Sequence, residues 1–443
     1  MARKQRPCAD DRPGRDQFYR QHHPAAGRCA GDRSVTVDVL SFGCRLNTYE
    51  GEVMRGHARE AGLSDTIIVN TCAVTSEAER QARQAIRRLA RERPDAKIVV
   101  TGCAAQIAPE TWGTLPGVSR VLGNAEKLDA AHWQADSPSA VSDIMQAKET
   151  AAHLVTEFAG RARAFVQVQQ GCDHRCTFCI IPFGRGPSRS VPLGAILDQC
   201  RSLIGNGYQE IVLTGVDITS YGHDLPGQPP LGQMVRRLLA LLPELPRLRL
   251  SSLDPCEIDE DLWKLIADEP RLLPHLHLSI QAGSDIILKR MKRRHLRADV
   301  LAVTQRARSL RPGIAFGADL IAGFPTETDE SFAETLALVE EADLTMLHVF
   351  PYSERSGTPA ARMPSVPRAV RKERAARLRA AGAAAEARFD ALHIGQTVRV
   401  LAETETRGHS EHFRPVRLSL DAVPGQIVTV TVTGSDADGL LAA

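Results

Sequence analysis

"DTIIVNTC" spans residues 65–72, and in it an apolar run typical of a buried strand passes directly into a polar loop that ends in a cysteine. The same pattern precedes it in "VTVDVLSFGC" (35–44) and follows it in "AKIVVTGC" (96–103). Helix-compatible sequence separates the three runs, and apolar strands that alternate with helices predict a parallel, doubly wound α/β sheet. In such a sheet the loops at the carboxyl ends of neighbouring strands converge on one crevice.

The cysteines that end these loops are Cys44, Cys72 and Cys103. Because their loops follow successive parallel strands, the topology predicts that the three sulfurs come together. A free cysteine is often a small buried apolar residue, and this alternative stays open for each of them. Three cysteines at equivalent strand ends, with polar neighbours such as Asn70 and Thr71, favour a shared ligand role.

A second set of three cysteines stands in "GCDHRCTFC" (171–179), which places Cys172, Cys176 and Cys179 in a CxxxCxxC spacing. A closed zinc site takes four ligands in tetrahedral geometry. His174 lies inside the motif, but it is too close in the loop to complete a tetrahedron with both flanking cysteines. Thiolates also hold iron–sulfur clusters, and a four-iron cluster on three thiolates leaves one iron open to a small molecule.

The motif follows the first of six strand-like runs between residues 163 and 355, most of which precede a helical pattern. The runs are "AFVQVQQ", "EIVLTG", "RLRLSS", "LHLSIQ", "IAFGADLIAG" and "TMLHVFPYS". Six β/α units predict an open, partial (β/α)6 barrel, whose chemistry is expected at the carboxyl ends of its strands. Strand-end capping is the alternative role for each residue predicted to face that site. These residues are Gly215, Asp217, Ser251, Gln281 and Asp319.

The chain as a whole divides into a series of predicted parts. Alternating apolar and polar residues with glycine turns predict a small antiparallel β barrel at the carboxyl end. Cys8 and Cys29, in the basic segment at the amino end, are expected to be incidental. The predicted parts are a disordered extension (1–33), the α/β domain (34–130), a linker (131–160), the partial barrel (161–365), a basic connecting helix (366–390) and the β barrel (391–443).

Composition narrows the class of protein. The net charge of +2 does not indicate a nucleic-acid partner by itself, so any such surface must be local. No apolar run reaches the length that crosses a membrane, and the amino end lacks the apolar core of a secretory signal. No membrane partner is therefore predicted. Ten cysteines without an export signal indicate metal or redox chemistry and predict a cytoplasmic protein.

"CTFC", with Phe178 before the last cysteine and a partial barrel around it, resembles the hallmark of the radical S-adenosylmethionine superfamily. The resemblance implies a [4Fe-4S] cluster on Cys172, Cys176 and Cys179, whose open iron binds the amine and carboxylate of S-adenosylmethionine. An electron from the cluster then cleaves this cofactor to a 5′-deoxyadenosyl radical. Phe178 and the strand-end residues named above are expected to contact the cofactor.

The likeness extends to the methylthiotransferases within this superfamily. "SFGCRLN", "VNTC" and "VTGC" are similar to their amino-terminal domain, "GADLIAGFPTETDE" and "FPYSERSGTPA" to their barrel, and the tail to their RNA-binding TRAM domain. The resemblance implies that Cys44, Cys72 and Cys103 hold a second [4Fe-4S] cluster, whose open iron takes a sulfur or methylsulfide. One S-adenosylmethionine would methylate this sulfur and another would supply the radical, so all six cysteines are expected to be catalytic.

"RGPSRS" (185–190), short and without an acidic residue, resembles the subgroup that acts on N6-threonylcarbamoyladenosine in tRNA. It implies transfer of a methylthio group to C2 of this nucleoside at position 37 of the anticodon loop, with a flavodoxin- or ferredoxin-type electron donor. Arg185 and Arg189 are predicted to meet the threonyl carboxylate. The alternatives are methylthiolation of isopentenyladenosine in tRNA or of a ribosomal-protein aspartate. Outside this family, an electron carrier or a structural zinc protein stays open.

Two features of the carboxy-terminal region predict contact with RNA. Phe413 is the main candidate for stacking on a base. The connecting helix is predicted to contact the RNA backbone through its basic side chains. These are Arg368, Arg371, Lys372, Arg374, Arg377, Arg379 and Arg388.

Overall fold

The computed structural model of the protein describes residues 37–148, 155–158, 160–419 and 421–443. The predicted extension, with Cys8 and Cys29, and part of the predicted linker lie outside these residues. None of the described helices combines the length and the apolar character that crossing a lipid bilayer requires.

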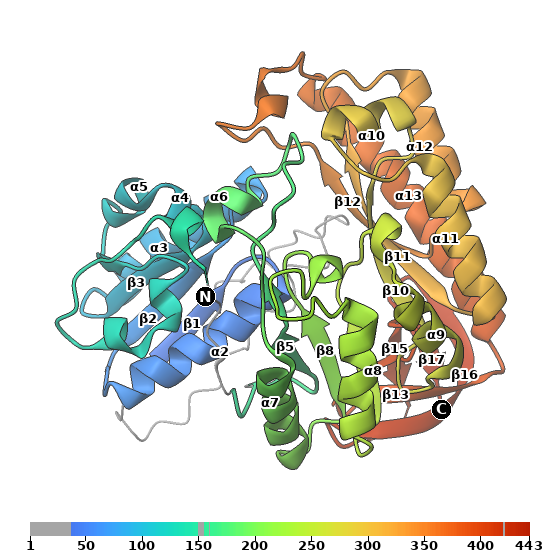
Figure 1. Ribbon diagram of the computed structural model, residues 1–443, viewed down its shortest axis with the longest axis horizontal. Helices are drawn as coiled ribbons and strands as arrows, with labels where there is room; N and C mark the ends of the chain where they lie inside the picture. The colour runs from blue at the N-terminus through green and yellow to red at the C-terminus, as the bar shows by residue number, and fades with distance from the viewer. Residues whose placement is uncertain (1–36, 149–154, 159, 420) are drawn as a thin grey trace, which may run out of the picture. The chain divides into compact units, whose positions relative to one another are not determined.

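The amino-terminal sheet is parallel, with its strands in the order β1-β2-β3-β4, and helices cover both of its faces (Figure 1). Met54 of one helix packs with Ile68 and Val99 on one face, and Ile86 of the next helix packs with Ile67 on the other. The predicted doubly wound arrangement is confirmed. The elements are β1 (Val37–Ser41), α2 (Arg45–Glu60), β2 (Thr66–Thr71), α3 (Ser76–Glu92), β3 (Lys97–Gly102), α4 (Cys103–Ile107), α5 (Pro109–Gly113) and β4 (Val118–Val121).

Six further strands form the wall of the predicted partial barrel, as two parallel sheets in the orders β5-β8-β9 and β10-β11-β12. Isolated bridges between Leu253 and Leu278 and between Leu248 and Leu272 connect the two sheets. A two-stranded ribbon of β6 (Gln169–Gln170) and β7 (Arg189–Ser190) flanks the first cysteine of the CxxxCxxC motif. The wall strands are β5 (Ala164–Gln167), β8 (Glu210–Thr214), β9 (Arg247–Leu250), β10 (His275–Gln281), β11 (Ala315–Ala322) and β12 (Met346–Pro351).

Helices follow most of these strands, and several of them share a hydrophobic core with the strands. The helices are α6 (Ile181–Arg185), α7 (Leu193–Gly205), α8 (Leu231–Leu241), α9 (Glu260–Asp268), α10 (Asp285–Met291), α11 (Arg297–Leu310) and α12 (Asp329–Glu341). Short 3-10 helices are η1 (Glu126–Leu128), η2 (Ala130–Trp133), η3 (Ile144–Gln146), η4 (Ile218–Ser220), η5 (Pro255–Glu257) and η6 (Pro359–Arg362).

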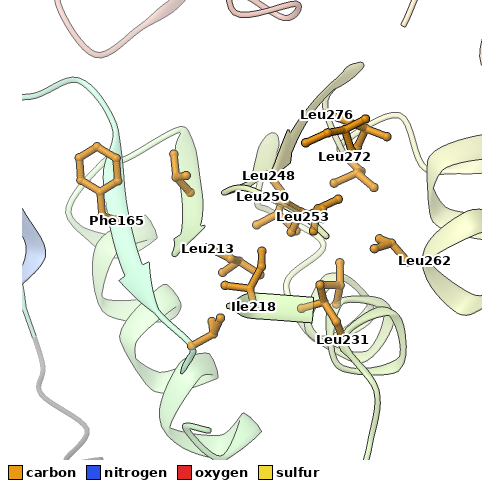
Figure 2. Packing of buried hydrophobic residues seen from close by; sticks show 14 of the residues in the cluster. Phe165, Leu213, Ile218, Leu231, Leu248, Leu250, Leu253, Leu262, Leu272 and Leu276 are labelled. Atoms are coloured by element: carbon orange, nitrogen blue, oxygen red, sulfur yellow. The ribbon is translucent and has the colours of Figure 1, made fainter. Parts of the chain in front are cut away.

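The core of the barrel lies between strands and helices. Figure 2 shows Leu213 and Leu250 from neighbouring strands pointing towards Leu231 of α8 and Leu262 of α9. Each such buried leucine contributes about 1.5–3 kcal/mol relative to an exposed one. Helix α2 of the amino-terminal domain joins the same core through Leu46, so it ties the two domains together along β5.

The chain ends in helix α13 (Arg368–His393) and a closed barrel in the order β13-β14-β15-β17-β16. The predicted barrel is confirmed, but its pairing is not antiparallel throughout, because β15 and β17 pair in parallel. Strand β17 turns back from β16 and inserts between β15 and β16, which gives it the direction of β15. The strands are β13 (Thr397–Thr404), β14 (Arg407–Ser410), β15 (Pro415–Leu418), β16 (Ile427–Asp436) and β17 (Gly439–Ala442).

The carboxy-terminal barrel docks at the starts of the wall strands. Phe413 stacks on His275, the first residue of β10, with ring centroids 5.5 Å apart. Arg249 of β9 donates to the carbonyl of Ser410 at 2.8 Å. The predicted stacking of Phe413 on an RNA base is therefore wrong for this conformation, because His275 already stacks on the Phe413 ring.

The basic helix divides into inward and outward side chains. Arg374 is buried and pairs with Glu327 at 2.8 Å and Asp329 at 2.6 Å, so it is not offered to RNA. Arg371 donates to the carbonyl of Tyr352 at 2.9 Å. The outward members, which keep the predicted role open, are Arg368, Lys372, Arg377, Arg379 and Arg388.

Candidate functional site

The three amino-terminal cysteines lie together after successive strands. Cys44 precedes α2, Cys72 follows β2 and Cys103 opens α4. A methyl group added at Gly43 would lie 2.8 Å from the sulfur of Cys72, so the first loop passes directly over the second. Burial, together with the charges of Cys103 and Cys44, raises the pKa of Cys72 to about 12.

Gly102 lets β3 turn into the helix that carries Cys103. Its φ of 96° and ψ of −176° fall in a region that glycine adopts and other residues avoid. A Cβ at this position would collide with the backbone of Thr71. The close approach of the β2 and β3 ends, and with it the position of Cys103, therefore depends on the missing side chain.

We expect Gly102→Ala to lower the free energy of unfolding by about 1–3 kcal/mol through backbone strain alone. The collision with Thr71 would add to this and displace Cys103. Urea unfolding measures the first effect and iron content after reconstitution the second. Gly56→Ala is the matched control, because Gly56 is helical and a Cβ there meets nothing within 4 Å. Equal stability of the two variants would contradict the prediction.

A buried set of charges lies against these cysteines. Arg185 donates to Glu50 at 2.5 Å, and Lys127 donates to the same carboxylate at 2.7 Å. The Nε of Arg185 lies 3.2 Å from the sulfur of Cys103. Burial alone would raise the pKa of Glu50, but Arg185 and Lys127 outweigh it and hold this pKa at about 2. Two cations therefore share one anion, and the excess positive charge faces the sulfurs.

This arrangement fits a metal–sulfur centre. Thiolates are the form in which cysteine binds metals, and a neighbouring buried cation stabilises negative charge on them. A tetrahedral zinc ion would bring sulfurs to about 3.8 Å from one another, given Zn–S bonds of about 2.3 Å. Among the described residues three groups bring ligand atoms within 4.8 Å of one another, and neither cysteine set is among them. The sulfurs of each set therefore lie farther apart than a single tetrahedral zinc ion would hold them.

The CxxxCxxC cysteines lie on the loop between β6 and α6. The amide of Cys179 donates to the carbonyl of Cys176 at 3.1 Å, which closes the turn between them. Arg293 brings its guanidinium to 3.6 Å from the sulfur of Cys176 and is held by Asp254 at 2.8 Å. Burial raises the pKa of Cys172, and the charges of Asp217, Cys179 and Cys176 raise it further. This set, too, has a cation beside its sulfurs.

Asp217, one of the predicted site residues, lies next to the first cysteine of this set. Its carboxylate accepts from the thiol of Cys172 at 3.7 Å and lies 2.9 Å from the Nε2 of His174. Burial opposes its ionisation, but His174, Ser220 and Thr219 keep the pKa of Asp217 below its usual value. His174 therefore faces Asp217, and these two with Cys172 form one of the three groups mentioned above.

The other predicted cofactor contacts occupy varied positions. Phe178 packs edge-on against Phe324, with centroids 6.4 Å apart. Ser251 is buried, and its hydroxyl has no hydrogen-bond partner in the described part of the chain. Gly215 follows β8, and Gln281 ends β10 with a φ of 74°. Their contact with a cofactor stays a prediction.

Asp319 lies within β11 rather than at the end of the strand, where the sequence pattern places it. There it pairs with His277 of β10 at 3.0 Å and His348 of β12 at 3.2 Å. All three side chains come from adjacent strands, and Asp319 and His348 keep 23% and 29% of their side-chain surface exposed. They therefore line the interior of the partial barrel where it is open to solvent.

The two cysteine sets approach each other through α4 and α6. A Cβ at Gly184 of α6 would lie 3.1 Å from the Cβ of Cys103. The charge of Cys103 contributes to the raised pKa of Cys179, which is about 12 and is mainly an effect of burial. A recess of about 480 Å³ opens beside this contact, lined in part by Gln106, Ile180 and Phe183.

Arg185 and Arg189, the predicted contacts of a substrate carboxylate, are both engaged within the protein. Arg185 is 2% exposed and is taken up by Glu50 and Cys103, as described above. Arg189 is also buried and donates to the carbonyls of Pro187 at 2.8 Å and of Arg185 at 3.0 Å. These contacts hold both guanidinium groups in place and give the predicted substrate contact no support.

Sequence reasoning missed several side chains at the site, among them Glu50, Lys127 and Arg293. A signal existed for Glu50, because it falls at helical spacing from Leu46 and Met54 on the buried face of α2. A charged residue in such a position is expected to have a buried partner. No comparable signal marks the other two.

Comparison with known proteins agrees with this geometry. The profile of the Radical SAM superfamily matches residues 166–339, and that of the Uncharacterized protein family UPF0004 matches residues 36–123. The chain is 54% identical over 402 residues to the Threonylcarbamoyladenosine tRNA methylthiotransferase MtaB of Rickettsia prowazekii (strain Madrid E), covering 90% of this chain and 96% of that protein.

The protein of the same name from Bacillus subtilis (strain 168) is 36% identical and covers 78% of this chain and 79% of its own. Among solved structures, the radical S-adenosylmethionine methyltransferase TsrM from Kitasatospora setae has a similar fold. Its TM-score is 0.54 at 15% identity, over 75% of this chain and 74% of that one. Because a relative more than half identical spans nearly the whole length, this chain belongs to the MtaB-type methylthiotransferases of the radical S-adenosylmethionine superfamily.

Proposed function

We propose that the protein transfers a methylthio group to C2 of N6-threonylcarbamoyladenosine at position 37 of tRNA, with two [4Fe-4S] clusters. Membership of the superfamily entails S-adenosylmethionine and one such cluster. The observation that carries the proposal is the second set of three sulfurs, next to the first and facing a buried excess of positive charge. The names of the similar proteins support the substrate.

The chain's own residues have separable tasks in this reaction. When bound, the clusters and S-adenosylmethionine supply the radical and sulfur chemistry that an unactivated aromatic C–H requires. Cys172, Cys176 and Cys179 would hold the cluster that binds the cofactor. The amino-terminal set, Cys44, Cys72 and Cys103, would hold the cluster that carries the sulfur. Arg185 and Arg293 compensate negative charge on the two sets.

The partners follow from the substrate. The outward basic residues of α13 and the carboxy-terminal barrel are proposed to bind the tRNA backbone around the anticodon loop. A flavodoxin- or ferredoxin-type protein is proposed to deliver the electron. Because tRNA and such reductants share the cytoplasm, the enzyme is proposed to act there.

Mass spectrometry of tRNA nucleosides tests the substrate. Cells that lack the protein should accumulate N6-threonylcarbamoyladenosine without its methylthio group, and the intact gene should restore the modification. Unchanged methylthio levels on this nucleoside would contradict the proposal. Loss of the methylthio group from isopentenyladenosine instead would favour the alternative tRNA substrate.

Iron analysis tests the number of clusters independently. The reconstituted wild type should hold about eight irons per chain, and a variant with alanine at Cys44, Cys72 and Cys103 about four. The same triple change at the CxxxCxxC cysteines should also leave about four. Four irons in the wild type would show that a single cluster is present.

A further inference from the structure

Arg45 occupies an unusual place between the two domains. It opens α2 directly after Cys44, and its guanidinium reaches the face of Phe413, with Cζ 5.3 Å from the ring centroid. Arginine stays protonated in proteins, so this side chain carries a positive charge at neutral pH. The same ring stacks on His275, so the cation lies beside the first residue of wall strand β10.

The other cations around Phe413 are neutralised by carboxylates. Arg163 pairs with Glu210 at 3.0 Å and with Glu403 at 2.9 Å. Arg249 also pairs with Glu210, at 2.8 Å. Glu210 is fully buried, and both of its oxygens already pair with arginines, Oε1 with Arg163 and Arg249 and Oε2 with Arg247.

The remaining carboxylate nearby, Asp319, is held by two histidines. His277 and His348 both approach the same oxygen of Asp319, at 3.0 Å and 3.2 Å. The close approach of His277 requires Gly317, because a Cβ there would lie 2.5 Å from its Nδ1. Among the described residues, Arg45 has no hydrogen bond or ion pair, and its contact is the ring of Phe413.

A half-buried cation without an anion is unfavourable unless a ligand completes it. We propose that Arg45 binds the threonyl carboxylate of N6-threonylcarbamoyladenosine and so selects this nucleoside; the inference rests on the function proposed above. The planar guanidinium matches a carboxylate through two parallel hydrogen bonds. Because Arg45 follows Cys44 directly in the chain, a carboxylate bound to its guanidinium would lie about the length of an arginine side chain from Cys44, one of the cysteines that would hold the sulfur.

The same cation disfavours the alternative tRNA substrate. An isopentenyl group has no charge and no hydrogen-bond acceptor, so binding it here would leave the guanidinium desolvated and unpaired. A site built around a polar contact rejects analogues that lack the matching group more strongly than an apolar pocket does. The role predicted for Arg185 and Arg189 therefore passes to Arg45.

The methionyl carboxylate of S-adenosylmethionine has the same chemistry, so the test separates the two sources. It uses the reconstituted full-length enzyme as wild type, Arg45→Gln and Arg45→Lys. Arg201→Gln is the matched control, because Arg201 is exposed on α7 and lies 3.9 Å from Asp198. The substrates are tRNA with N6-threonylcarbamoyladenosine and the same tRNA with the threonyl carboxylate converted to its carboxamide.

Arg45→Gln should lower kcat/KM on the natural tRNA by about 10- to 100-fold, as expected for a lost charged hydrogen bond. On the carboxamide tRNA the wild type should fall by a similar factor and Arg45→Gln should lose little more, because the two changes remove one interaction. On the natural tRNA, the kcat/KM of Arg45→Lys should lie between that of the wild type and that of Arg45→Gln. Formation of 5′-deoxyadenosine without tRNA and the iron content should match the wild type in every variant.

Two results would overturn the inference. An equal loss of tRNA-independent 5′-deoxyadenosine formation in Arg45→Gln would assign the cation to the cofactor's carboxylate. If Arg45→Gln lowered kcat/KM on the carboxamide tRNA by the same factor as on the natural tRNA, Arg45 would not bind the threonyl carboxylate. If Arg45→Gln does not take up iron, kcat/KM of Arg45→Lys on the natural tRNA and on the carboxamide tRNA is compared with the wild type instead, and the same two results would overturn the inference. A wild type that never modifies the natural tRNA would instead refute the proposed function.

Discussion

Cys176→Ser is expected to abolish both methylthio transfer and the formation of 5′-deoxyadenosine, to the level of the reaction without enzyme. The physical reason is that two thiolates and a weakly binding hydroxyl cannot hold a cluster in the geometry that leaves one iron open to the cofactor. High-performance liquid chromatography of 5′-deoxyadenosine after addition of dithionite measures the effect.

Cys103→Ser is the informative companion, because it changes the other set. It should eliminate methylthio transfer while the tRNA-independent formation of 5′-deoxyadenosine persists. Cys256→Ser is the matched control, because Cys256 is exposed and lies in η5. This variant should keep the full iron content and activity of the wild type. If Cys176→Ser and Cys103→Ser behaved alike in both assays, the division of tasks between the two sets would be wrong.

The strands and the meeting of the cysteine loops could be predicted from sequence because both depend on local pattern. Apolar runs such as 66–71 are buried on both sides, and parallel pairing then fixes where the following loops lie. The spacing of Cys172, Cys176 and Cys179 places them on one loop whatever the rest of the chain does. Such features need no knowledge of distant contacts.

The partners of the arginines could not be predicted, because they depend on contacts across the whole chain. Arg185 meets Glu50, which is 135 residues away in sequence, and Arg249 meets Ser410, 161 residues away. An arginine in a loop near a cluster motif is equally compatible with a substrate contact and with a buried ion pair. Phe413 illustrates the same limit, since an aromatic residue in an RNA-binding type of barrel can also serve to dock that barrel.

Glu50→Ala is expected to lower the free energy of unfolding by about 3–5 kcal/mol, the range measured when one partner of a buried ion pair is removed. Arg185 and Lys127, with 2% and 0% of their side chains exposed, would be left as two buried cations without an anion. Urea unfolding of the iron-free protein isolates this effect from cluster loss. Glu77→Ala is the control, because Glu77 and Arg80 form an exposed pair that water screens.

The pH dependence of stability in Glu50→Gln separates the effect of the Glu50 charge from the effect of its side-chain shape. The folded pKa of Glu50, about 2, is below its unfolded value of 4.5, so its contribution is fully present above about pH 4.5 and is lost as the pH falls towards 2. Glu50→Gln keeps the shape and removes the charge; it should therefore be less stable than the wild type at pH 7, and the difference should shrink in acid. A variant as stable as the wild type at pH 7 would show that Lys127 and Arg185 do not need the carboxylate.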